Sequence, residues 1–145
     1  LITMAAFNKF RQFVEDLAEG VHNFSPDATR TLTAALTATA NAPVNTNTVL
    51  ANLTQISYTN LSSRVIPVSA SSQTAGTYTL ACTDTMLTAS GGSVAAFQYV
   101  AIYNDDPTSP ADPLIGWYDY GSAVTLADTE TFTLDFGASG LLQIA

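Results

Sequence analysis

Three runs decide the fold: AAFQYVAIYN at residues 95–104, PLIGWYDY at 113–120 and ETFTLDF at 130–136. Each is short, rich in aromatic and branched residues, and bounded by Gly, Pro, Asn, Asp or Ser, which is typical of β-strands between turns. Similar runs occupy residues 31–38, 64–70, 76–85, 122–127 and 141–144. Short strands at intervals near ten residues, without crossover helices, predict a mainly β chain. We expect an antiparallel sandwich or small barrel of the jelly-roll or immunoglobulin-like kind.

Two strand runs carry further information about their position. In residues 31–38, Leu and Ala alternate with Thr, which predicts a strand that is buried on one face only. Pro67 interrupts the run at 64–70 and predicts an edge strand, because proline cannot donate a hydrogen bond to a ladder. In the run at 113–120, Trp117 should face away from Tyr118 and Tyr120.

The N-terminal stretch has a different periodicity. In residues 6–22, apolar side chains recur at spacings of three and four, which predicts a helix that ends near Gly20. The apolar face of this helix consists of Phe7, Phe10, Val14, Leu17 and Val21, and Phe13 widens it. Glu15, Asp16 and Glu19 should face solvent on the opposite side. We therefore expect an N-terminal amphipathic segment at 1–24 and a single β-domain at 25–145. The segment either docks on a partner or, as the favoured alternative, covers the core of its own domain.

Charge is scarce and unevenly placed. Only 11% of the 145 residues are charged, and the net charge is −8. All four basic residues lie within the first 64 positions, whereas eight acidic residues and no basic one follow Val65. Nucleic-acid binding is therefore not expected, because it needs clustered Lys and Arg. A surface poor in charge suits contact with other proteins, although a Thr- and Ser-rich β-protein exposed to water is an equal alternative.

Residues for catalysis, metal binding or membrane insertion are few. His22 is the only histidine and has no acid at a recognisable spacing, so a structural role is favoured over that of a base. Cys82 should be a buried apolar residue, and neither a disulfide nor a zinc site is expected. No apolar run reaches the roughly 18 residues of a membrane span, and no signal-peptide pattern is present, which predicts synthesis in a cytoplasm.

An acidic stretch is the one pattern that suggests a cation. Asp105, Asp106, Asp112 and Asp119 lie close in sequence, but their spacing does not match a calcium loop, so a solvated acidic loop is favoured over bound calcium. Chance pairs of carboxylates are expected in an acidic β-protein and do not indicate a glycosidase. The sequence therefore predicts no enzyme activity, no cofactor and no metal.

Long stretches of the chain resemble a protein family. The runs TLTAALTATANAPVNTNTVLANLTQI (31–56), SSQTAGTYTL (71–80) and YVAIYNDDPTSPADPLIGWYDYGSAVTLADTETFTLDFGASGLLQIA (99–145) are similar to small virion-associated structural proteins of tailed bacteriophages. This resemblance implies a capsid decoration or cement protein on the outer surface of the head. It also implies that the major capsid protein is the partner and that the chain is a homo-oligomer, usually a trimer.

The alternative function is a tail- or fibre-associated module that binds a sugar or protein on the host surface. In either role, the expected contact residues lie in the N-terminal segment and in the stiff loop at 104–112: Phe7, Phe10, Phe13, Val14, Leu17, Asp105, Asp106 and Pro107. Deleting residues 1–20 should then abolish attachment and leave the β-domain folded.

Overall fold

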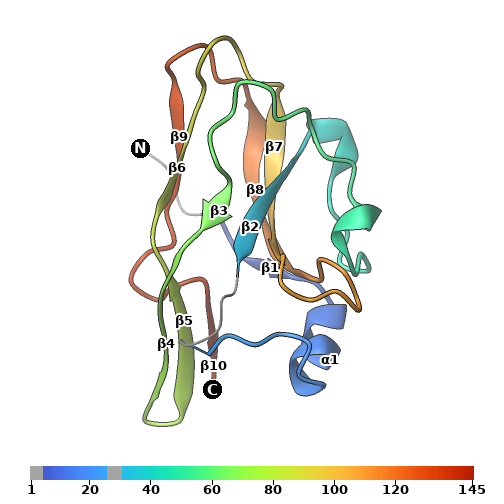
Figure 1. Cartoon of the computed structure of the whole chain (residues 1–145), viewed down its shortest axis with the longest axis vertical. Helices are drawn as coiled ribbons and strands as arrows, with labels where there is room; N and C mark the ends of the chain where they lie inside the picture. Colours follow the sequence, from blue (N-terminus) through green and yellow to red (C-terminus); the bar gives the residue numbers. More distant parts are fainter. Residues whose placement is uncertain (1–4, 26–30) are drawn as a thin grey trace.

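Antiparallel sheets are the main regular secondary structure of the chain, in a computed structural model that describes residues 5–25 and 31–145 (Figure 1). Its strands are β1 (Asn8–Lys9), β2 (Leu32–Thr37), β3 (Val65–Ile66), β4 (Val68–Thr74), β5 (Thr77–Cys82), β6 (Thr85–Thr88), β7 (Phe97–Asn104), β8 (Leu114–Val124), β9 (Thr131–Leu134) and β10 (Leu142–Ile144). The helical elements are α1 (Gln12–Ala18) and the 3-10 turns Thr39–Asn41 and Leu50–Asn52. The prediction of a mainly β, sandwich-like chain is confirmed.

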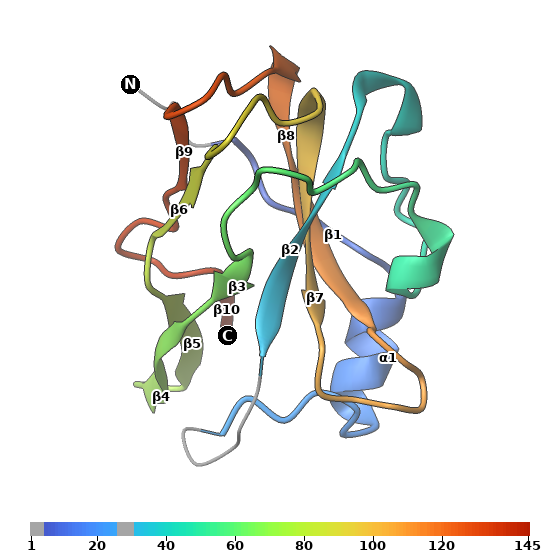
Figure 2. The same cartoon turned by 45° about the horizontal axis from the view of Figure 1, so that its top comes forward.

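Three sheets form the sandwich-like arrangement. A five-stranded sheet has the order β1-β8-β7-β2-β3, a three-stranded sheet the order β10-β5-β4, and β6 pairs with β9. In Figure 2 the five-stranded sheet stands opposite the two smaller sheets. The chain passes from β3 to β4 at Pro67, and both strands are sheet edges, as the proline predicts.

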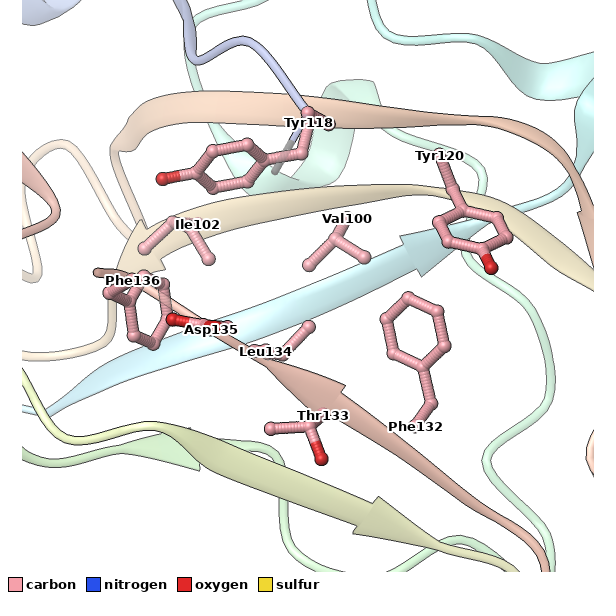
Figure 3. A pocket seen from close by; sticks show the side chains of 10 residues that line it. Val100, Ile102, Tyr118, Tyr120, Phe132, Thr133, Leu134, Asp135 and Phe136 are labelled. Carbon is pink, nitrogen blue, oxygen red and sulfur yellow. The ribbon is translucent and has the colours of Figure 1, made fainter. Parts of the chain in front are cut away.

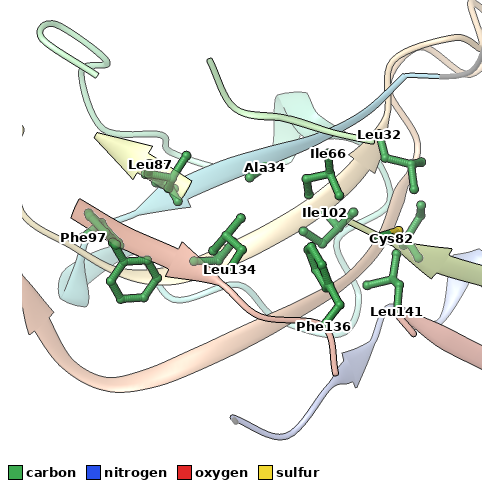
Figure 4. Close-up of a cluster of buried hydrophobic side chains, with 14 of the residues drawn as sticks. Leu32, Ala34, Ile66, Cys82, Leu87, Phe97, Ile102, Leu134, Phe136 and Leu141 are labelled. Carbon is green, nitrogen blue, oxygen red and sulfur yellow. The ribbon is translucent and has the colours of Figure 1, made fainter. Parts of the chain in front are cut away.

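The main core fills the space between the five-stranded sheet and the smaller sheets. It includes Leu36 and Ile102 from the large sheet, Leu80 from β5 and Leu87 from β6, all fully buried. Figure 4 shows Phe136 and Leu141 pointing into the same cluster from the C-terminal segment. The C-terminal residues therefore help to close the core.

A second core cluster covers the opposite face of the five-stranded sheet. Phe10, Ala35, Ala101, Tyr103 and Leu114 form it, with Leu50, Leu53 and Trp117 packed against it. All six residues of β2 are consequently buried, so the prediction of a half-buried strand at 31–38 is wrong. The alternation of Leu and Ala with Thr predicted one exposed face, but other segments of the chain cover both faces of this strand.

Strand boundaries differ from the sequence prediction at three places. The run at 64–70 divides at Pro67 into β3 and the beginning of β4, which continues to Thr74. The run at 76–85 corresponds to β5, and its last residue already begins β6. The runs at 113–120 and 122–127 were expected to be separate, but β8 continues through Gly121 to Val124. Its far end stays paired with β7, where Val124 lies opposite Phe97. Between the pairs Tyr99–Asp119 and Phe97–Val124 the register shifts, so Gly121 lies in an irregular stretch within one strand rather than in a turn between two strands.

The N-terminal segment is less helical than predicted. The helix spans only Gln12–Ala18, whereas Asn8 and Lys9 form β1 against Trp117 and Gly116 of β8. The helix ends near Gly20, as expected, and Gly20 has a left-handed φ of 77°. Its buried face carries Phe13 and Asp16, so the expected solvent position of Asp16 is wrong. The segment lies on its own sheet, which is the favoured alternative of the sequence analysis.

Candidate partner-binding site

His22, the only histidine, is buried in an aromatic environment. Its ring stacks on Phe24 with centroids 5.3 Å apart and lies 5.1 Å from the Phe13 ring. Its Nδ1 is 3.3 Å from the Asn104 side-chain amide nitrogen. Burial lowers the pKa of His22 to about 4, although the nearby Asp16 carboxylate opposes this shift. A neutral, enclosed imidazole has a structural role, so His22 is not placed to act as a base on a substrate.

The acidic loop is organised by hydrogen bonds within the protein. Asp106 accepts a hydrogen bond from the Thr31 amide at 3.0 Å, and Asp119 accepts one from the Gln98 side chain, also at 3.0 Å. Desolvation, followed by the contact with Asp105, raises the pKa of Asp112. Within residues 5–25 and 31–145, no group of three metal-ligating side chains gathers. Asp105 and Asp106 are exposed and Pro107 is half-buried, so this loop is accessible to a partner.

The aromatic residues of β8 divide between the two faces of the sheet, as predicted. Trp117 packs on Phe10 with ring centroids 4.6 Å apart, whereas Phe7 lies 5.6 Å from Tyr118 on the opposite face. Burial raises the pKa of Tyr118 to about 12, so its hydroxyl stays protonated. Phe10 thus occupies one side of Trp117, which is half-buried against the second core cluster.

A small cavity opens beside these tyrosines, between β8 and β9. It has a volume of about 50 Å³, and Figure 3 shows Val100, Tyr118, Tyr120 and Phe132 around it. The lining is mainly apolar. This space fits one or two water molecules or a methyl group, so it is too small for a substrate or a sugar.

The predicted contact residues of the N-terminal segment separate into two groups. Phe10 and Phe13 are buried in the two core clusters and fix the segment to the sheets. Phe7 and Leu17 are half-buried, and Val14 is 52% exposed on α1. Only Leu17, Val14 and part of Phe7 therefore remain available to a partner.

These accessible side chains line a large apolar groove of about 610 Å³. One wall is the N-terminal segment, with Phe7, Lys9, Phe13, Val14 and Leu17. The other wall is the C-terminal segment Ser139 to Ile144, in which Ile144 is 39% exposed. The sequence analysis predicted the strand at 141–144 but not its part in a contact surface. The apolar pair Leu142 and Ile144, two positions apart, is the signal that was available.

The groove brings the predicted contact residues Phe7, Phe13, Val14 and Leu17 together with the C-terminal segment. None of the helices in the described ranges is long and apolar enough to cross a membrane. Comparison of the chain with protein-family models, with curated proteins and with solved structures found no match.

Proposed function

We propose that the chain is a structural protein of a tailed-phage virion, a decoration or cement protein that stabilises the head by binding between major capsid subunits. The observation that carries this proposal is the apolar groove between α1 and the C-terminal segment, with Val14 and Ile144 exposed at its rim. Val14 and Leu17, which were expected to contact a partner, both line this groove.

The chemistry of the groove suits a protein partner. Interface cores are depleted in charge, and Lys9 is the one charged side chain among those that line the groove. Stable protein interfaces bury about 1,600 Å² in total, so the groove would form the centre of a contact that extends over neighbouring surface. The exposed loop with Asp105 and Asp106 is a candidate for such a second contact.

The charge of the chain supports a position on the outside of a head. With a net charge of −8, the chain is repelled by the phosphates of packaged DNA. An acidic protein is compatible with the outer surface, where only the shell protein must be contacted. Assembly as a trimer on the shell is part of the proposal and follows from the sequence resemblance.

The copy number of the chain in purified particles tests the proposal. Quantitative mass spectrometry should give about one copy per major capsid subunit, or one trimer per local three-fold axis. A few copies per particle would instead support the tail- or fibre-associated module. Absence from particles that were purified without dissociating salt would contradict both functions.

A further inference from the structure

Two of the strands that contribute residues to the groove, one on each wall, are edge strands of their sheets. β1 pairs with β8 on one side and β10 pairs with β5 on one side, and neither has a second neighbour among the described strands. Residues of both strands line the groove. An unpaired strand edge presents backbone N–H and C=O groups that an extended segment can pair with. The backbone at this site is therefore suited to a strand rather than to a helix or a small molecule.

The side chains of the groove suit the alternating face of such a strand. Phe13, Leu141 and Leu142 are buried beneath it, and Val14 and Ile144 are exposed at its rim. The volume of about 610 Å³ equals that of roughly twenty water molecules, which is enough for several apolar side chains. In a strand, every second side chain points to the same face. Apolar residues at alternate positions would therefore enter the groove together.

Lys9 defines the charge that the incoming strand should carry. Lys9 lines the groove and forms no ion pair with residues in the described part of the chain. Glu15 and Glu19, in contrast, are exposed on the neighbouring helix segment and would repel a strand with many acidic residues. An incoming strand with one carboxylate that reaches Lys9 would complement the charge of the groove.

We infer that the groove binds one extended strand of a different protein, which adds to the edge of β10 and carries apolar residues at alternate positions and a single carboxylate opposite Lys9. This inference rests on the proposed function, since it describes the segment of the shell partner that would be held. A second copy of this chain is the competing occupant, and the oligomeric state in solution distinguishes it from a strand of a different protein.

Nuclear magnetic resonance of the isotope-labelled full chain tests the inference with two probe peptides. One is acetyl-Ser-Val-Thr-Val-Thr-Glu-Ser-amide, in which Glu lies on the same face as both Val residues, and the other has Lys in place of Glu. The Glu peptide should shift the amide signals of Leu142, Gln143 and Ile144 and slow their hydrogen exchange. Lys9→Glu should weaken binding of the Glu peptide by about 1.5- to 5-fold and strengthen binding of the Lys peptide.

Arg11→Glu is the matched control, because it makes the same change in net charge at an exposed residue that does not line the groove. It should leave the preference between the peptides nearly unchanged. The inference is overturned if neither peptide binds at about 1 mM, if the shifts lie away from β10, or if Lys9→Glu and Arg11→Glu act equally.

Three further outcomes identify the occupant and separate this inference from the proposed function. A dimer in sedimentation experiments that disappears in Ile144→Asp would make a second copy the occupant and overturn the inference. If the peptides do not bind but the protein is abundant in particles, the inference of strand binding is rejected and the proposed virion function is kept. If the peptides bind but the protein is absent from particles, the proposed virion function is rejected and the inference of strand binding is kept.

Discussion

The ring of Phe7 lies against Gly116 and fills the space that a β-carbon at position 116 would need. The Asn8 carbonyl oxygen lies 2.7 Å from the same position. Gly116 is opposite Lys9 in the register of β1 and β8. The missing side chain therefore allows the N-terminal strand to approach the sheet closely, which in turn places one wall of the groove.

Gly116→Ala should lower the free energy of unfolding by about 1–3 kcal/mol, because the new methyl group collides with Phe7 and with the β1 backbone. Chemical denaturation measures the effect. Ser122→Ala, at an exposed position of the same strand, should change stability by less than about 0.5 kcal/mol. Equal stabilities of the two variants would show that Phe7 does not need this space.

The strands were predictable where one local pattern agreed with the tertiary contacts. β7 lies within the predicted run 95–104, and β9 lies within 130–136. Gly121 suggested a break between two strands, because glycine is typical of turns, but the structure places it in an irregular stretch of β8, and pairing with β7 resumes at Val124. Local composition therefore located the strands, and pairing between distant segments determined their ends.

The candidate site was predictable only in part. Val14 and Leu17 were expected to contact a partner, and both line the groove. Phe10 was included because it shares the helical spacing, yet it lies outside the helix in the second core cluster. The opposite wall, Ser139 to Ile144, is more than 120 positions away in the sequence, and no local pattern connects it to α1. Folding alone brings these segments together.

Thr37→Val should stabilise the protein by about 1 kcal/mol. Thr37 is fully buried, and its hydroxyl has no hydrogen-bond partner among the described residues. A buried hydroxyl without a partner costs free energy, and valine keeps the branched shape that suits a strand. Thermal unfolding measures the change. Thr131→Val, at an exposed strand position, should have little effect, and destabilisation by Thr37→Val would reveal a partner for the hydroxyl.

Stability should decrease as the pH falls from about 6.5 to 4, the interval between the ordinary pKa of histidine and that of buried His22. The unfolded chain binds a proton in this range and the folded chain does not, so acid favours unfolding. The loss should be about 1.4 kcal/mol for each pH unit. Urea unfolding at several pH values measures it. His22→Gln should remove this part of the slope, and an unchanged slope would assign the acid sensitivity to carboxylates.

Val14→Asp should weaken attachment to particles at least about tenfold, because it places a charge in an apolar contact. Folding stability should change by less than about 1 kcal/mol, since Val14 is exposed. Val44→Asp is the matched control, with 53% exposure at a position that does not line the groove. Co-sedimentation with particles that lack the protein measures attachment. Equal attachment of both variants would place the contact elsewhere.

Removal of residues 1–20 should unfold the protein rather than abolish attachment alone, so the sequence-based expectation of an intact β-domain is revised. Phe10 is fully buried and Phe13 is 4% exposed. Loss of a buried Phe side chain costs about 3–5 kcal/mol, and typical proteins have a total stability of about 5–15 kcal/mol.

The single variant Phe10→Ala isolates this effect and should lower the free energy of unfolding by about 3–5 kcal/mol. Val14→Ala, in the same segment but exposed, should change it by less than about 0.5 kcal/mol. Urea denaturation compares these variants with the truncated chain. A truncated chain that unfolds cooperatively at the original midpoint would show that the segment is a separable arm. In that case Phe10 and Phe13 would not anchor α1 to the sheets in the full chain, and the wall of the groove that the N-terminal segment forms would have no fixed position.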